Sequence, residues 1–373
     1  MSIINSILPV YASDISGVCS ALYELGGMTV VHDASGCRST YTTHDEPRWE
    51  ESPSKVYFSA LTERDIMRGS DERFIDGVAS TALRQHPAFI CICASPVAVM
   101  TGVDMDACAR EIERRTGIWT FHAATTGTRP YTYGVDAALL EIVKKYTFPL
   151  PIRPGGANII GATPLDFWGR QVIEDIRREV TDMCFDVLCC MAMGDTLDDI
   201  ARAGAAEVSL VISSGGLSAA RYLYDTCGIP YVCGVPTGGR LSEEIRSLLL
   251  RRDGSIRAEG ISAVTVGDTI AIGERITAMS AAHSYTLETG KPAKAICTVG
   301  YEGYRPPSEE ELRRVLSRAG KIIGDPLYRY ICPDRAFVSK PHFAFSGRMY
   351  FGSGEAPTKS RPRRHKVRLK KSL

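Results

Sequence analysis

The chain lacks the features that mark secreted and membrane proteins. Its 12 cysteines are about 3% of 373 residues, well below the density of a disulfide-rich scaffold. No run approaches the ~18 apolar residues of a membrane helix, and the first ten residues lack the basic flank and apolar stretch of a signal peptide. We therefore expect a cytoplasmic protein with reduced thiols, most of them core residues and a minority able to bind metal.

Motifs for nucleotide hydrolysis and zinc binding are also missing. The sequence has no Walker A segment, so we do not expect this chain to hydrolyse ATP. Cys184, Cys189 and Cys190 lack the spacing of a zinc ribbon, and we expect them to be core residues.

Basic residues are concentrated at the end of the chain. Eight Lys and Arg and no acid follow residue 355, while the rest has 36 basic and 43 acidic residues, a net charge of about −7. Residues 356–373 are expected to form a disordered basic tail, either a solubilising extension or a contact for nucleic acid or an acidic partner. No recognition motif accompanies the tail, so we do not expect a nucleic-acid-binding protein.

Apolar runs alternate with amphipathic stretches along three successive units, which predicts three Rossmann-like α/β domains with parallel sheets. We place the domains at residues 1–150, 151–256 and 257–355, with a proline–glycine linker at 151–156.

Expected strands lie in all three units, at 28–32, 56–59, 88–93, 119–122, 157–161, 208–214, 230–233, 261–266, 293–299, 321–325 and 343–346. Expected helices lie at 72–85, 104–116 and 270–279.

Glycine loops follow several expected strands of the second and third units, at 215–216, 234–239 and 267–268. Ligands bind at the carboxyl ends of parallel strands, so these loops could cradle a ligand between the two units. His342 could face the same cleft, or it could be a satisfied core histidine.

Two cysteines of the first unit suggest a metal site. Cys19 and Cys37 each lie beside glycine and small residues, with a short amphipathic segment and a strand between them. Two thiolates brought together in this way suit an iron–sulfur cluster, since glycine lets the backbone close around it. The alternative is a pair of buried thiols near a turn.

Several segments together resemble the nitrogenase component 1 family over most of residues 8–350. They are Cys19 with VHDASGC (31–37), LTERD (61–65) with Gly69, SPVAVMTGVD (95–104), GDTLDDI (194–200), SSGGL (213–217) and GIPYV (228–232). The family includes dinitrogenase subunits, light-independent protochlorophyllide reductase and nickel-sirohydrochlorin reductive cyclase. THDEPRW (43–49) and GDPL (324–327) look like a short nitrogenase-like branch of anaerobes.

The resemblance implies a three-domain nitrogenase-like fold and a [4Fe-4S] cluster held by Cys19 and Cys37. It also implies a homodimer or a heterodimer with a related subunit, a separate ATP-dependent iron protein as electron donor, and a small-molecule or tetrapyrrole-like substrate. Ligands of the family's large catalytic cofactor have no match, so we do not expect dinitrogen reduction.

The third cluster cysteine of the family is replaced by Ser95. Cys91, Cys93 and Ser95 share one face of a strand, so Cys93 could be a substitute ligand, or Cys91 and Cys93 could be small core residues. A cubane needs four ligands. They could come from two chains, each giving two thiolates, or from one chain using Cys93 and a non-cysteine ligand.

The polar segment after Cys37 holds the catalytic candidates. His44 is the best proton donor, because histidine titrates near neutral pH. Arg38 and Arg48 could bind a substrate carboxylate, or they could belong to a structural ion-pair loop. Farther along, Glu63 and Asp65 are expected to cap a helix.

Three kinds of function remain open from the sequence. The first is an enzyme subunit that receives single electrons and reduces an unsaturated or macrocyclic molecule in an interdomain cleft. The second is a non-catalytic scaffold that carries or assembles a metallocofactor. The third is a cluster-free ligand-binding module.

Overall fold

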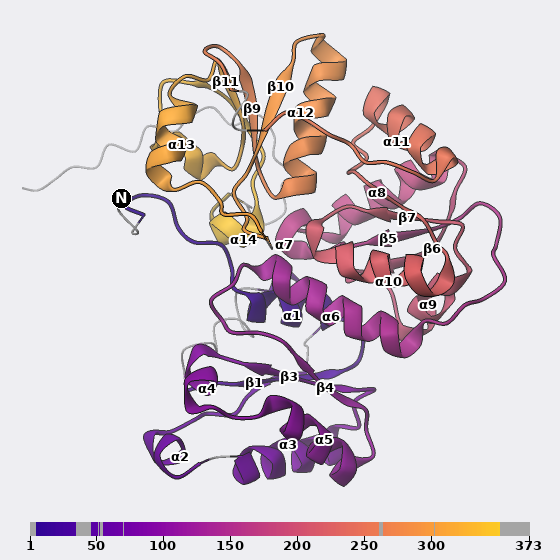
Figure 1. The fold of residues 1–373 in the computed structure, drawn as a ribbon, viewed down its shortest axis with the longest axis vertical. Coiled ribbons are helices and arrows are strands. Elements are labelled where there is room, and N and C mark those ends of the chain that lie inside the picture. Colours follow the sequence, from indigo (N-terminus) through magenta and orange to yellow (C-terminus); the bar gives the residue numbers. More distant parts are fainter. Residues whose placement is uncertain are drawn as a thin grey trace, which may run out of the picture.

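The computed structural model describes residues 5–34, 46–50, 52, 55–69, 71–260, 264–301 and 303–350. Cys37, Arg38 and His44 lie outside the described residues, as does the basic tail. Within the described ranges, three four-stranded sheets are entirely parallel, which confirms the predicted α/β class (Figure 1).

The first sheet has the order β2-β1-β3-β4. Its strands are β1 (Met28–His32), β2 (Val56–Phe58), β3 (Ile90–Ala94) and β4 (Thr120–Ala123). The helices are α1 (Asp14–Leu22), α2 (Glu63–Arg68), α3 (Asp71–Gln85), α4 (Pro96–Thr101), α5 (Met105–Thr116) and α6 (Tyr131–Tyr146). A short 3₁₀ turn covers Pro47–Glu50.

The second sheet repeats this topology as β6-β5-β7-β8. Its strands are β5 (Gly156–Ile160), β6 (Asp186–Met191), β7 (Val208–Val211) and β8 (Tyr231–Cys233). The helices are α7 (Pro164–Phe167), α8 (Arg170–Asp182), α9 (Leu197–Arg202), α10 (Leu217–Cys227) and α11 (Gly239–Arg251).

The third sheet repeats it again as β10-β9-β11-β12. Its strands are β9 (Thr269–Gly273), β10 (Ala293–Cys297), β11 (Lys321–Gly324) and β12 (Ala336–Ser339). The helices are α12 (Arg275–Thr289), α13 (Glu309–Leu316) and α14 (Phe343–Ser346).

Helices cover both faces of the first sheet, so its central strands β1 and β3 are buried throughout. Side chains of β3 alternate between two cores: Cys91 and Cys93 join the core under α1 and α6, whereas Ile90 and Ile92 join the core under α3 and α5. The first of these cores continues into the second domain, because α6 also packs against α10 (Figure 1).

Two predicted elements of the third unit were wrong. Residues 270–273 form the strand β9, and the helix begins only at Arg275. Residues 343–346 form a buried helical turn, α14, where a strand was expected. Apolar runs of four residues do not distinguish a strand from a buried helical turn, so tertiary packing decides.

Helix ends and cysteine burial follow the prediction at several places. Thr62 and Asp65 form the capping box at the start of α2. Cys189 and Cys190 are buried core residues, but Cys184 is exposed. None of the described helices is long and apolar enough to cross a membrane.

Candidate functional site

Helices α1 and α6 cross with their backbones in contact, because each carries a glycine at the crossing. A Cβ atom on Gly17 would lie 2.0 Å from the carbonyl oxygen of Tyr131, and one on Gly134 would lie 1.7 Å from that of Asp14. No other residue fits at either position without moving the helices apart. The crossing therefore holds α1, which carries Cys19, directly against α6.

Cys19 lies in the apolar core under α1 and is only 1% exposed. Its expected partner, Cys37, falls outside the described residues. Within the described ranges, no three His, Cys, Asp or Glu side chains are grouped so that they could hold a metal ion. The donor chemistry of Cys19 fits an iron–sulfur cluster, and the other ligands would have to come from Cys37 or a second chain.

Cys93 is enclosed in the core, one residue before the carboxyl end of β3. Its Sγ lies 4.0 Å from the Sγ of Cys91. The hydrogen bond with Cys91, together with burial, raises the pKa of Cys93 well above its usual value. Its place in the apolar core under α1 and α6 agrees with the small-core-residue alternative.

Ser95 begins helix α4 at the carboxyl end of β3. Its hydroxyl oxygen accepts a hydrogen bond from the N–H of Ala98 at 3.3 Å. The serine that replaces the family's cysteine therefore has a local role as a helix cap.

Arg48 is buried, and acceptors surround its guanidinium. Nε donates to Oε1 of Glu46 at 2.7 Å, and Nη2 donates to Oε2 of Glu46 at 3.1 Å and to the carbonyl oxygen of Ser20 at 2.7 Å. Nη1 donates to Oε1 of Glu24 at 3.2 Å and to the carbonyl oxygen of Ala192 at 3.0 Å. These contacts use all five guanidinium N–H groups. The geometry favours the structural ion-pair alternative over substrate binding.

Three polar side chains, one from each domain, meet at the centre of the molecule. Nε2 of His342 lies 3.2 Å from the hydroxyl of Tyr131 and 3.1 Å from Oδ1 of Asp166. The Tyr131 hydroxyl donates to the same carboxylate oxygen, and the Ser213 hydroxyl donates to Oδ2 at 2.7 Å. We call Tyr131, Asp166 and His342 the junction cluster. Figure 1 shows α6, α7 and α14, which carry or adjoin these residues, converging there.

Tyr11 connects the junction cluster to a group of hydroxyls in the third domain. Its ring centroid lies 5.4 Å from that of His342. Its hydroxyl lies 2.6 Å from Oγ1 of Thr298 and 3.3 Å from the hydroxyl of Tyr328. Tyr328 in turn donates to Thr298 at 3.1 Å. Three hydroxyls thus share hydrogen bonds on one side of the His342 ring.

These hydroxyls form part of the wall of a cleft between the first and third domains. The cleft has a volume of about 440 Å³ and is lined by Tyr11, Thr298 and Tyr328, with Arg129 and Gly300 among its other residues. Its size lies within the usual range of small-molecule sites. Arg129 is exposed and gives the cleft a cation.

Burial shifts the acid–base behaviour of this region. It raises the pKa of Tyr11 and Tyr131 well above 10, helped at Tyr131 by the charge of Asp166, so both phenols keep their protons at neutral pH. Burial and then the charge of Asp166 also raise the pKa of Glu274 above 4.5. Glu274 accepts the N–H groups of Ser214 at 3.0 Å and Thr277 at 2.9 Å.

The glycines at 215–216 serve packing. A Cβ on Gly215 would lie 2.7 Å from Cγ1 of Val135, and one on Gly216 would lie 2.7 Å from Cγ2 of Ile160. They let α6 approach the second sheet closely.

Sequence reasoning did not single out Tyr11, Tyr131 or Asp166. They lie far apart along the chain and share no motif with His342. Asp166 had one usable signal, because it closely follows the carboxyl end of β5, where such folds place ligand sites. His342 is 9% exposed and hydrogen-bonded, which agrees with the satisfied-core alternative.

Comparisons with known proteins agree with this topology. The sequence profile described as nitrogenase component 1 type oxidoreductase matches residues 16–260. A subunit of light-independent protochlorophyllide reductase from Roseiflexus sp. (strain RS-1) is 25% identical over 186 residues, 48% of this chain and 32% of that protein. The corresponding protein from Chloroflexus aggregans is 23% identical over 257 residues, 65% of this chain and 46% of that protein.

Among solved structures, "Nitrogenase Cp1 at pH 6.5" has a TM-score of 0.62 at 14% identity, covering 91% of this chain and 87% of that one. This likeness shows a shared fold. The chain spans less than half the length of the two reductase proteins it matches. Since the family profile covers well over half of the chain, the protein belongs to the nitrogenase component 1-type oxidoreductase family.

Proposed function

We propose that this chain is a subunit of a nitrogenase-like oxidoreductase that holds a [4Fe-4S] cluster at Cys19 and Cys37. In this proposal two copies, or a copy and a related subunit, supply two thiolates each. The observation that supports it is the position of Cys19 on a helix fixed by the glycine crossing, in a chain of this family. When bound, such a cluster supplies one-electron transfer.

The residues around Cys19 have a positioning role in this proposal. Arg48 holds the 3₁₀ turn at Pro47–Glu50 against α1 through the carbonyl oxygen of Ser20, the neighbour of Cys19. The apolar core under α1 excludes water from the thiol. A dry, rigid shell favours transfer of electrons without reorganisation of the protein.

Electrons would come from a separate ATP-dependent iron protein. Two short helices at the carboxyl end of the first sheet expose apolar side chains that suit a docking protein. These side chains are Ile66 and Met67 on α2 and Val99 and Met100 on α4. Met67 is 86% exposed and Met100 is 87% exposed. A docking protein would cover these exposed side chains and remove their apolar surface from water.

The substrate would bind in the cleft between the first and third domains. Tyr11, Thr298 and Tyr328 would offer protons at its wall. Arg129 would attract an acidic group of the substrate, the role expected of Arg38 and Arg48 from the sequence. We propose an unsaturated small molecule carrying a carboxylate as the substrate class, reduced in one-electron steps.

The cluster is tested by iron content after anaerobic purification. Wild type should contain iron and sulfide and show the spin-resonance signal of a reduced cluster. Cys19→Ala should lose most of the iron while its melting temperature changes little, because a buried thiol contributes about 1 kcal/mol of packing. Cys108→Ala is the matched control: Cys108 is equally buried but lies in the core under α3 and α5, so iron should be retained.

Iron retained in a folded Cys19→Ala variant would remove the site assignment. An iron-free wild type would favour the cluster-free ligand-binding module. If iron is present, reduction of carboxylate-bearing substrates with an added ATP-dependent iron protein separates the enzyme from a metallocofactor scaffold. Under that assay Tyr11→Phe should lower the rate and leave iron content unchanged.

A further inference from the structure

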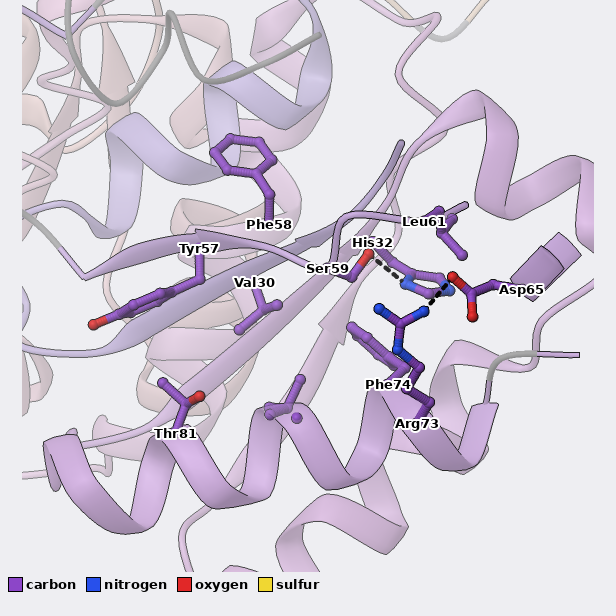
Figure 2. Close-up of a pocket in the computed structure, with 12 residues that line it drawn as sticks. Val30, His32, Tyr57, Phe58, Ser59, Leu61, Asp65, Arg73, Phe74 and Thr81 are labelled. Atoms are coloured by element: carbon purple, nitrogen blue, oxygen red, sulfur yellow. Dashed lines mark hydrogen bonds and ion pairs between the residues drawn. The ribbon is translucent and has the colours of Figure 1, made fainter. Parts of the chain in front are cut away.

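A second cavity lies in the first domain, on the opposite side of the sheet from Cys19. It opens between the edge strand β2, strand β1 and helix α3, with a volume of about 320 Å³ (Figure 2). Val30, Phe74 and Val78 line it and belong to the core under α3 and α5, whereas Cys19 belongs to the core under α1. The cavity is therefore separate from both the cluster region and the interdomain cleft.

A glycine in the middle of α3 lies at the wall of the cavity. Gly77 lines the cavity, and a Cβ placed on it would meet no atom within 4 Å. A glycine inside a helix is less favourable than an alanine, because it loses more backbone freedom on folding. Packing in the folded chain does not require glycine here, in contrast to Gly134 at the helix crossing. The missing side chain instead leaves room for another molecule.

An ion pair with spare hydrogen-bonding capacity stands at one side of the cavity. Oδ2 of Asp65 accepts from the N–H of Thr62 at 2.9 Å, from its hydroxyl at 2.7 Å, and from Nη1 of Arg73. Oδ1 of Asp65 has no hydrogen-bond partner among the described residues, and Arg73 uses one of its five N–H groups there. Hydrogen bonds from Arg73 and Thr62 lower the pKa of Asp65 to about 2, so the pair is ionised at neutral pH.

The wall beside this pair is polar but uncharged. His32 is 1% exposed, and its Nδ1 lies 2.8 Å from the Ser59 hydroxyl. Burial lowers the pKa of His32 to about 4, so the imidazole is neutral at pH 7. Its ring lies 4.1 Å from that of Phe74, which continues the apolar floor toward the ion pair. Figure 2 shows His32, Asp65, Arg73 and Phe74 gathered at one end of the cavity.

We propose that this cavity binds a small aromatic molecule with a primary carboxamide head. The apolar ring would lie over Val30 and Val78, in the space left by Gly77. The amide N–H would donate to Oδ1 of Asp65 and its carbonyl oxygen would accept from Arg73. A carboxylate would instead face the Asp65 anion, and an ammonium would face the Arg73 cation, so a neutral head with both a donor and an acceptor matches best.

The test is an NMR titration of the full chain with benzamide, benzoate, benzylamine and toluene, followed through the methyl signals of Val30 and Val78. Benzamide should bind about tenfold more tightly than the other three compounds. One or two well-made hydrogen bonds contribute about this much to affinity. Arg73→Met should lower the affinity for benzamide to the affinity for toluene. Gly77→Leu should abolish binding of all four, because the leucine side chain fills the cavity.

Gly77→Ala is the matched control. Its single methyl group takes little of the cavity volume, while the helix propensity of α3 rises about as much as in Gly77→Leu. It should keep the preference for benzamide, and both Gly77 variants should melt no lower than wild type. The proposal is overturned if benzamide moves neither methyl signal in wild type, if Gly77→Leu binds it unchanged, or if benzoate binds equally well. None of these outcomes depends on the iron content that tests the cluster.

Discussion

Two buried polar regions of the molecule differ in how their charges are balanced. Around Arg48, one fixed cation is saturated by two carboxylates and two carbonyl oxygens. In the junction cluster, a carboxylate, a phenol and an imidazole share hydrogen bonds that can be redrawn when a proton moves. A saturated network resists change and suits a structural part, while a network of titratable groups suits proton transfer.

The largest expected effect breaks the first network. Arg48→Ala removes a cation from the buried Glu46 carboxylate, whereas Glu24 keeps its ion pair with Arg170, and the free energy of unfolding should fall by about 3–5 kcal/mol. Chemical denaturation measures this loss. Arg114→Ala, which removes an exposed pair with Glu111, should cost less than about 1 kcal/mol. The substrate-binding alternative for Arg48 would be supported if the Arg48→Ala protein kept wild-type stability but bound anionic substrates more weakly.

The next effect concerns the helix crossing that joins the two regions. Gly134→Ala places a methyl group within 1.7 Å of the Asp14 carbonyl oxygen, so α1 must move away from α6. We expect a loss of roughly 1–3 kcal/mol, typical of overpacking, measured by thermal or chemical denaturation. Gly77→Ala makes the same change in an open helix and should stabilise the protein by up to about 1 kcal/mol. If Gly134→Ala and Gly77→Ala changed the free energy of unfolding in the same direction, the close contact at the helix crossing would be contradicted.

The smallest effect is a pH dependence near the junction cluster. Below pH 4.5, Glu274 is protonated in both the folded and unfolded states. Above that pH the unfolded chain loses the proton first, because the folded pKa is raised. The wild type therefore loses stability relative to Glu274→Gln as the pH rises, by up to about 1.4 kcal/mol per pH unit until the folded pKa is passed. Denaturation curves of both proteins between pH 4 and 8 measure this difference, and parallel curves would contradict it.

The repeated alternation of apolar runs and amphipathic stretches was sufficient to predict the α/β class with parallel sheets. The run 28–32 is buried throughout because helices cover both faces of its sheet. The same signal failed at 270–273 and 343–346, where a short run rich in apolar residues fits either a strand or a helical turn.

The candidate sites were predicted less evenly. Cys19 was selected from its neighbours, and its role as a cluster ligand stays a prediction. Arg48 was selected by residue type, and only the folded structure revealed that Ser20 and Ala192, one of them 144 positions away, take up its donors. Tyr11, Tyr131 and Asp166 could not be found from local pattern, because the contacts that unite them with His342 join three domains.

The sequence by itself determined the fold class, the family and the choice of Cys19 as a candidate ligand, because these depend on local periodicity and on short segments. Only the tertiary structure decided which polar groups are saturated and which can exchange protons. It also distinguished Gly134, which a neighbouring backbone requires, from Gly77, which borders open space. The physical reason is that burial and hydrogen-bond partners are supplied by residues distant along the chain, and no local pattern encodes them.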